Sequence, residues 1–464
     1  MIPAGVKAVI DRLHGADREA YTVGGCVRDL ILGRKPKDWD ITTNALPCEV
    51  EEIFGQGAVP TGKKNGTITV IYDGGRDGAE HEAYEVTTYR IDGEYKDNRH
   101  PSRVSFTRNL KEDLMRRDFT INAIAMDEAG NIEDPIGGVQ DIEAGIIKAV
   151  GDPEDRFDED ALRIMRGIRF EAELSPLGFV IDEATENAIH DRKHLLKNIS
   201  AERIRIELSK IIVSGGAEAV LRKYRDVVSV IIPEIEPSFG FDQQNPYHCY
   251  DVYEHILHTV KGIEPAGCER IPDCDHAFLT VRLAAFLHDI AKPGQFSVRE
   301  GRGHFYGHEQ EGAKIAEKVL RRLRYDRRTT EDVVFLISKH GTVFNPTEVY
   351  ARRKLHQMGE RRLRMLIALG RGDVGAQSEC ADGGSVRRAR LAVIDDFERC
   401  VDRVISEASC FTLKDLAVDG EDLIAAGIPQ GPEIGRILQD MLGKVIGGEI
   451  PNDRYTLLKN YHLL

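Results

Sequence analysis

The sequence lacks the features that define several classes of protein. No apolar run in its 464 residues approaches the roughly 18–20 residues that a membrane-spanning helix needs, so we expect no membrane partner. Residues 1–15 carry charges inside their apolar stretch and do not resemble a secretory signal. The eight cysteines form no CxxC pair, and the chain has no fixed-period repeat or low-complexity tract. These absences exclude disulfide-scaffold and collagen-like classes and predict a reduced, cytoplasmic protein.

The composition is typical of a globular protein. Hydrophobic residues make up 41% and charged residues 30% of the chain, and its length suggests about three domains. The net charge of −14 argues against a protein that coats nucleic acid, but it does not exclude local basic patches.

The patterns of the first third differ from those of the rest. Runs 67–71 and 82–89 are rich in β-branched and aromatic residues and predict strands, whereas the polar segment 91–103 predicts a loop. After Gly151, apolar residues recur at helical spacing with almost no strand signal. The chain therefore predicts an α+β fold in which a mixed-sheet head precedes an all-helical body. We divide it into four parts: 1–150, 151–240, 241–380 and 381–464.

The segment YTVGGCVRD, residues 21–29, indicates a first candidate site. A strand-like run leads into Gly24 and Gly25 and then into a short helical pattern. Backbone N–H groups in such a turn can bind an anion, and Arg28 lies one turn further on, where it can pair with a phosphate. A simple tight turn is the alternative interpretation.

Two aspartates follow this turn. Asp38 stands 13 residues after Gly25, and Asp40 lies two positions further along what resembles a strand. Residues two apart on a strand face the same side, so both carboxylates are expected at one site. Because adjacent carboxylates repel each other, they need a cation between them, and Mg²⁺ prefers oxygen ligands. The alternative is a solvated turn with two surface acids.

These residues belong to a longer set of motifs that resembles a known family. The motifs occur in order and cover much of residues 20–210: 21–43, 63–70, 84–106, 116–127 and 158–170. They resemble the tRNA nucleotidyltransferase and poly(A) polymerase group of polymerase-β-like nucleotidyltransferases, most closely the bacterial class II CCA-adding enzymes. The resemblance implies a polymerase-β-like head (1–150), a helical neck that binds base and RNA (151–240), an HD domain (241–380) and a tRNA-binding tail (381–464).

The resemblance also implies a reaction and roles for the head residues. An RNA 3′-hydroxyl attacks the α-phosphate of a nucleoside triphosphate and releases pyrophosphate. Asp38 and Asp40 are implied to hold two Mg²⁺ ions and to be the catalytic residues. The triphosphate is implied to lie against Gly24, Gly25 and Arg28. Arg117 adds positive charge beside it, and Asp118 helps to orient Arg117.

A predicted helix at 158–174 carries a stripe of charged residues at spacing three: Asp160, Arg163, Arg166 and Arg169. A surface ladder of ion pairs explains this spacing equally well. By resemblance to the EDxxR motif, Asp160 and Arg163 select the base, and Arg166 and Arg169 support nucleotide binding. An acceptor and a donor held together can accept cytosine and adenine and reject guanine and uracil.

The choice within the group rests on the segment 92–106, which is intact and favours full CCA addition to tRNA from CTP and ATP. An enzyme that adds only A keeps the same segment, and a poly(A) polymerase is the other near alternative.

The helical body contains a second candidate site. His288 and Asp289 lie in an apolar helical stretch, where an ionised aspartate is costly unless it is paired or bound to metal. Six residues resemble the ligand pattern of the HD phosphohydrolases, including members with two metals: His255, His288, Asp289, His308, His340 and Asp373. This donor set suits Mn, Fe, Co, Ni or Zn. The alternatives are core histidines or an HD fold without metal. A phosphohydrolase acting on RNA ends is the rival function of a different class.

Two basic segments, 314–328 and 352–371, are candidates for contact with RNA phosphates, and solvated helix faces are the alternative. Residues 416–442 resemble the tail of HD-containing bacterial CCA-adding enzymes.

Overall fold

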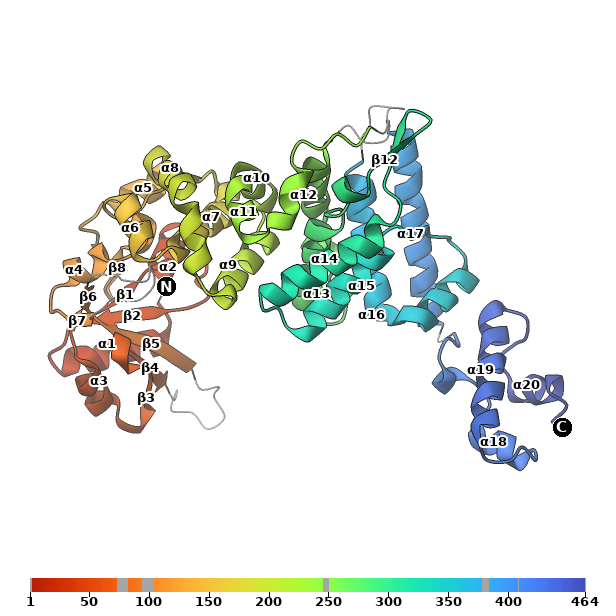
Figure 1. Cartoon of the computed structure of the whole chain (residues 1–464). Coiled ribbons are helices and arrows are strands. Elements are labelled where there is room, and N and C mark those ends of the chain that lie inside the picture. The colour runs from red at the N-terminus through yellow and green to blue at the C-terminus, as the bar shows by residue number, and fades with distance from the viewer. Residues whose placement is uncertain are drawn as a thin grey trace. The chain divides into compact units, whose positions relative to one another are not determined.

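A computed structural model describes residues 2–72, 82–93, 104–244, 250–377, 384–407 and 409–463 of the chain. The chain divides into two compact units, residues 1–233 and 234–464 (Figure 1). Of the predicted loop 91–103, residues 94–103 lie outside the described residues.

The first unit is built on a mixed β-sheet. Within the described residues its strand order is β3-β4-β5-β2-β1-β8-β9. Strands β2 and β5 run parallel, and the other neighbouring pairs run antiparallel. The strands are β1 (Ala20–Val23), β2 (Asp40–Thr43), β3 (Ala58–Gly62), β4 (Thr67–Tyr72), β5 (Glu82–Thr88), β8 (Ala125–Met126) and β9 (Ile132–Glu133). Three further pairs are short: β6 (Arg90–Asp92) with β7 (Val104–Phe106), β10 (Ile146–Ile147) with β11 (Val180–Ile181), and, in the second unit, β12 (Ser297–Arg299) with β13 (Arg302–His304).

The β-branched runs form two neighbouring strands of this sheet, and their prediction as strands is confirmed. On β4, Ile68 and Val70 are buried, and on β5 Tyr84 and Val86 are buried, with more exposed residues between them. This alternation places one face of each strand on the core. The register sets Ile68 opposite Val86, so that apolar side chains from the two strands meet.

Helices surround the sheet and continue into the neck. Those of the head are α1 (Ala4–Gly15), α2 (Gly25–Ile31), α3 (Pro47–Phe54), α4 (Leu110–Met115) and α5 (Gly138–Ala144). Those of the neck are α6 (Pro153–Glu159), α7 (Leu162–Leu174), α8 (Glu183–Arg192), α9 (Ala201–Val213), α10 (Ala217–Lys223) and α11 (Arg225–Ile231).

The prediction of a single helix over residues 158–174 is wrong. Helix α6 ends at Glu159, Asp160 has an extended backbone with φ −135° and ψ 99°, and α7 begins at Leu162. The Asp160 carboxylate accepts a hydrogen bond from the Leu162 backbone N–H at 3.1 Å. Aspartate side chains commonly satisfy the free N–H groups at the start of a helix, so Asp160 begins a new helix instead of continuing the old one.

The second unit is helical and carries one hairpin that the sequence did not predict, β12–β13. Its helices over residues 252–406 are α12 (Val252–Gly262), α13 (Cys274–Leu287), α14 (His308–Arg322), α15 (Arg327–Lys339), α16 (Glu348–Gly375) and α17 (Ser385–Ser406). Helix α16 changes direction at Gly359, whose φ of 74° is not helical. The predicted architecture, a mixed-sheet head followed by a helical body, is confirmed.

The C-terminal helices have a core of their own. They are α18 (Gly420–Ala425), α19 (Pro432–Gly447) and α20 (Arg454–Asn460). Leu423, Met441 and Leu457, one from each helix, are fully buried in one apolar cluster. Across the described ranges, none of the helices combines the length and the hydropathy needed to cross a bilayer.

Candidate functional site

The two predicted metal-binding aspartates lie at the start of β2. Asp40 is the first residue of the strand, and Asp38 lies in the chain just before it; both are exposed. On the neighbouring parallel strand β5, Glu85 stands in register with Asp40 and is also exposed. The sequence analysis missed Glu85, because only the pairing of β2 with β5 brings it to this site.

The charges around Asp40 favour a bound cation. Loss of hydration raises the pKa of the Asp40 carboxyl, the Arg117 guanidinium opposes this shift, and the negative charges of Glu85 and Asp38 reinforce it. Carboxylates that destabilise one another's charge are stabilised when a hard cation lies between them, and Mg²⁺ prefers such oxygen ligands. The donor set therefore fits Mg²⁺.

The Gly24–Gly25 turn is held against two arginines. Gly24 has φ 84°, and a Cβ atom placed on it would lie 3.4 Å from Nη1 of Arg117. Arg28 is buried, where its Nη1 donates to Asn122 Oδ1 at 2.9 Å and its Nη2 donates to Asp29 Oδ1 at 2.9 Å. The structure thus brings the double glycine, Arg28 and Arg117 together, and Arg28 is already held by protein groups.

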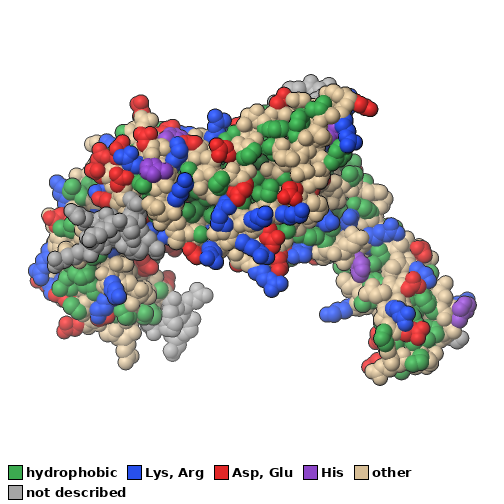
Figure 2. Space-filling model, in the orientation of Figure 1, with side chains coloured by type: hydrophobic (Ala, Val, Ile, Leu, Met, Phe, Trp, Pro, Cys, Tyr) green, Lys and Arg blue, Asp and Glu red, His purple; other side chains and the backbone are tan. Residues whose placement is uncertain are grey.

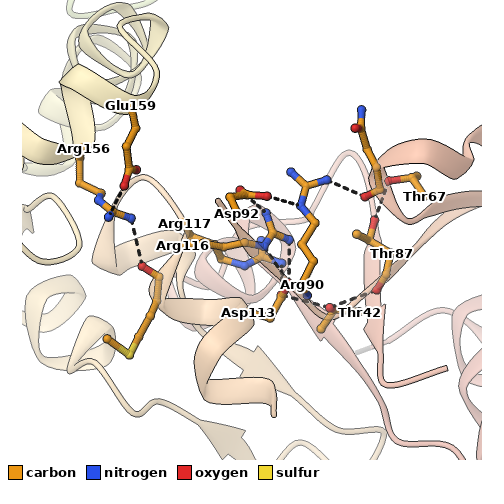
Figure 3. A network of polar contacts seen from close by, with 12 residues as sticks. Thr42, Thr67, Thr87, Arg90, Asp92, Asp113, Arg116, Arg117, Arg156 and Glu159 are labelled. Carbon is orange, nitrogen blue, oxygen red and sulfur yellow. Dashed lines mark hydrogen bonds and ion pairs between the residues drawn. The ribbon is translucent and has the colours of Figure 1, made fainter. Parts of the chain in front are cut away.

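Asp113 on α4 orients Arg117 (Figure 3). Its carboxylate is fully buried; Arg117 Nη2 donates to it at 3.3 Å and Arg116 Nη2 at 2.7 Å. Although burial opposes the shift, these two arginines hold the pKa of Asp113 below its usual range. The Thr42 hydroxyl on β2 also donates to this carboxylate, at 3.2 Å. Asp113 therefore ties Arg117 to the strand that carries Asp40.

The predicted role of Asp118 as the partner of Arg117 is wrong. The Asp118 carboxylate accepts from Arg166 Nε at 2.6 Å, and Arg166 Nη2 lies 2.5 Å from it. Burial alone would raise the pKa of Asp118, but Arg166 and Arg163 lower it to about 2. Asp118 lies between the head and α7, where the guanidinium of Arg166 is the nearer partner.

The predicted base-selecting residues lie at the α6–α7 junction. Asp160 accepts from Arg203 of α9 at 2.8 and 3.2 Å, and Arg163 donates to Glu159 at 3.0 Å and to the Arg116 carbonyl at 3.0 Å. Arg203 is 43 residues from Asp160 in the chain, so the sequence analysis missed it. Arg169 is buried and donates to Glu207 at 2.6 Å.

In the second unit, the six predicted ligands converge from five helices or helix ends. Within the described residues, two groups of three have ligand atoms within 4.8 Å of one another: His255, His288 and Asp373, and Asp289, His308 and His340. Asp289 lies between them. Its Oδ2 is 3.1 Å from His288 Nε2 and its Oδ1 is 3.5 Å from His308 Nε2. This is the arrangement of a carboxylate that can bridge two adjacent metal ions.

Backbone carbonyls orient three of these histidines for metal binding. His288, His308 and His340 each donate Nδ1–H to the carbonyl three residues earlier, at 2.8, 2.7 and 2.7 Å. The Nε2 lone pair of each ring then remains available for an ion. The Nε2 atoms of His308 and His340 are 3.1 Å apart. The donor set fits imidazole-binding transition metals better than Mg²⁺.

A buried lysine forms an ion pair with Asp289 at the centre of this site. Lys292 Nζ lies 2.6 Å from Asp289 Oδ2 and donates to Gln243 Oε1 at 2.9 Å. Gln243 itself is fully buried. Gln243 lies outside the HD pattern, so the sequence analysis did not single it out.

The two basic segments are largely engaged in ion pairs. On the face in Figure 2, basic and acidic side chains are intermixed over α14 and α15. Such surface pairs contribute little to stability, and they leave less free positive charge for RNA. The pairs are Arg321 with Glu317, Arg322 with Glu234, Arg327 with Glu331, Arg328 with Asp273, Arg361 and Arg362 with Asp332, and Arg371 with Asp395 and Glu398. This favours the alternative of solvated helix faces, and RNA contact here stays a prediction.

Family models match along the chain in four places. They are described as poly A polymerase head domain (20–148), probable RNA and SrmB-binding site of polymerase A (178–238), HD domain (247–370) and tRNA nucleotidyltransferase domain 2 (387–461). The CCA-adding enzyme of Limosilactobacillus reuteri is 32% identical over 454 residues, which cover 98% of this chain and 94% of that enzyme. The chain belongs to the CCA-adding enzyme family.

Another relative aligns over a shorter region, whereas solved structures of the family match nearly the whole chain. The enzyme of Lactobacillus helveticus is 52% identical over 218 residues, so the chain spans 52% of that relative's length and the match covers 47% of the chain. Among solved structures, the Bacillus stearothermophilus CCA-adding enzyme in complex with CTP matches with a TM-score of 0.68 and 28% identity, over 100% of this chain and 98% of that one. The Thermotoga maritima CCA-adding enzyme complexed with tRNA has a TM-score of 0.61 at 20% identity, covering 99% of this chain and 96% of that one, and shares the fold.

Proposed function

We propose that this chain adds CCA to the 3′ ends of tRNA, with CTP and ATP as substrates, in the cytoplasm. The observation that carries this proposal is the group of Asp38, Asp40 and Glu85 beside Arg117 and the Gly24 turn. Support comes from the L. reuteri relative, which is named for this activity and aligns over nearly the whole chain. The likeness to a CTP-bound family structure agrees with it.

Different residues of the head bind the cations and the triphosphate. Asp38, Asp40 and Glu85 hold the divalent cations, which when bound activate the attacking oxygen and stabilise the leaving phosphates. Gly24, Gly25 and Arg117 bind the triphosphate, while Arg28 supports the turn. The RNA 3′-oxygen bonds to the α-phosphorus, the bond to the bridging oxygen breaks, pyrophosphate leaves, and the hydroxyl proton passes to solvent.

We assign base selection to Asp160 and Arg163, with Arg166 and Arg169 in support. Both selecting residues are held by neighbours, Asp160 by Arg203 and Arg163 by Glu159, which keeps the acceptor and the donor in fixed positions. We also propose that the chain has four domains, with boundaries at residues 150, 240 and 380.

The test uses tRNA transcripts that end before CCA, after C and after CC. Each is incubated with Mg²⁺ and labelled CTP, ATP or both, and the products are resolved at single-nucleotide length. We expect completion to CCA followed by a stop, and a loss of at least about 10³-fold for Asp40→Asn. Addition of A alone would identify an A-adding enzyme, and long A tails a poly(A) polymerase.

A second activity is favoured by the two ligand groups around Asp289. We propose that the HD centre, loaded with Mn, Fe, Co, Ni or Zn, hydrolyses phosphate esters at RNA ends. We expect Asp289→Ala to abolish hydrolysis of 2′,3′-cyclic or 2′-phosphate ends and to leave CTP incorporation intact. Joint loss of both activities would indicate unfolding, and an inactive metal-loaded wild type would refute this second function.

A further inference from the structure

The HD centre opens into two separate cavities of about 360 and 650 Å³. Three residues line both of them: His340, Gly341 and Asp373. Because two of these are metal ligands, a group bound at the metals has one cavity on each side. Both volumes are in the range that small-molecule ligands occupy.

The smaller cavity has an aromatic wall. The Tyr306 ring is 62% exposed and stacks on the His304 ring at 5.3 Å between centroids, with 5° between the planes. The guanidinium of Arg299 lies 5.2 Å from the centroid of the Tyr306 ring. Flat aromatic surfaces beside a cation are suited to stacking a nucleobase. Lys292 lies in the same cavity, where it adds positive charge.

The larger cavity has an apolar wall of exposed valines. Val343 is 83% exposed, and on α17 Val386 and Val393 are 42% and 37% exposed. Val386 and Val393 are seven residues apart and so share one face of α17, which further along buries Phe397. Arg390 lines the same cavity and donates to Gln377 Oε1 at 2.8 Å. An apolar wall with a cation beside it suits a base that is joined to a sugar phosphate.

We propose that the HD centre cleaves linear phosphodiesters that join two nucleosides, with one nucleoside in each cavity. This proposal rests on the phosphohydrolase function proposed above and names its substrate class. The oxygen of a water molecule bonds to phosphorus and the bond from phosphorus to one ester oxygen breaks. One nucleoside leaves with a free hydroxyl that has taken one water proton, and the other keeps the phosphate. A monoester or a 2′,3′-cyclic phosphate has a single nucleoside and fills only one side.

The experiment fills the larger cavity without touching a metal ligand. Val393→Trp and Val386→Trp place an indole on its wall, and Ala392→Trp, also exposed on α17 but outside both cavities, is the matched control. Full-length protein loaded with Ni²⁺ or Mn²⁺ is given a linear adenosine dinucleotide, adenosine 2′,3′-cyclic phosphate and an adenosine monophosphate. Binding of a non-hydrolysable phosphonate-linked adenosine dinucleotide is measured separately by calorimetry.

We expect wild type to cleave the linear dinucleotide. Either tryptophan in the cavity should lower its kcat/KM and weaken phosphonate binding by about tenfold or more, while hydrolysis of the cyclic phosphate changes less than about twofold. Ala392→Trp should behave as wild type. The proposal is overturned if the linear dinucleotide is not cleaved while the cyclic phosphate is, or if the cavity variants bind the phosphonate as well as wild type. If no ester is hydrolysed with any metal, the phosphohydrolase function itself fails.

Discussion

Single side chains in the head and neck are positioned by charged partners, some on the same turn of helix and others more than 40 residues away. Asp113 holds Arg116 and Arg117, Asp118 holds Arg166, and Asp160 holds Arg203. Each carboxylate is at most one-fifth exposed, and buried charges of this kind are costly unless they are paired. In each pair the aspartate carboxylate therefore fixes the position of the arginine guanidinium.

The Asp118–Arg166 pair predicts a pH-dependent contribution to stability. The pKa of Asp118 is lowered to about 2, so the ionised form stabilises the fold at pH values above the ordinary carboxyl pKa, and this contribution is lost as the pH falls towards 2. We expect Asp118→Asn to reduce the free energy of unfolding of the first unit by about 2 kcal/mol at pH 7 and by about 1 kcal/mol at pH 3.

Urea unfolding at the two pH values measures this difference. Asp191→Asn, an exposed aspartate on α8, serves as the control and should change the stability little at either pH. A loss for Asp118→Asn that is the same at both pH values would contradict the assignment of the stability to the ionised carboxylate.

At the level of secondary structure, periodicity predicted most of what the chain forms. Strands β1, β4 and β5 follow from their β-branched runs, and Gly24 ends β1 because its φ of 84° suits glycine. The break between α6 and α7 could not be predicted from periodicity, because the apolar spacing continues through it. Its causes are a hydrogen bond from the Leu162 N–H to Asp160 and an ion pair to Arg203, and only the second lies far away in sequence.

This junction yields a prediction about base choice. Arg203 of α9 fixes Asp160 between two helices, so Arg203→Met should free the carboxylate. We expect kcat/KM for CTP to fall by about tenfold and UTP to be incorporated more often, because one charge-assisted hydrogen-bonded pair is lost. Arg203→Lys keeps the charge and should recover part of the selectivity. Unchanged discrimination between CTP and UTP in the methionine variant would show that Asp160 needs no such support.

For the whole molecule, the order of the parts was readable from the sequence, while the composition of each site was readable only in part. The six candidate HD ligands were singled out because His288 and Asp289 lie in an apolar stretch and the whole set resembles the HD ligand pattern, and the structure brings them together. Glu85, Asp113 and Gln243 were not found, because each is an ordinary residue in its own segment. They join their sites through a strand pairing, a buried ion pair and a hydrogen bond from Lys292, respectively.

The backbone hydrogen bonds of His288, His308 and His340 have a consequence for how an ion is captured. His288 and His340 are fixed by carbonyls of their own helices and His308 by the Phe305 carbonyl in the turn before α14, so these three rings are oriented before any ion arrives. Binding then costs little side-chain conformational entropy, and the entropy change is dominated by the ion and the waters that it releases. We therefore expect the metal preference of this candidate centre to be set by the chemistry of its donor atoms and not by rearrangement of the fold.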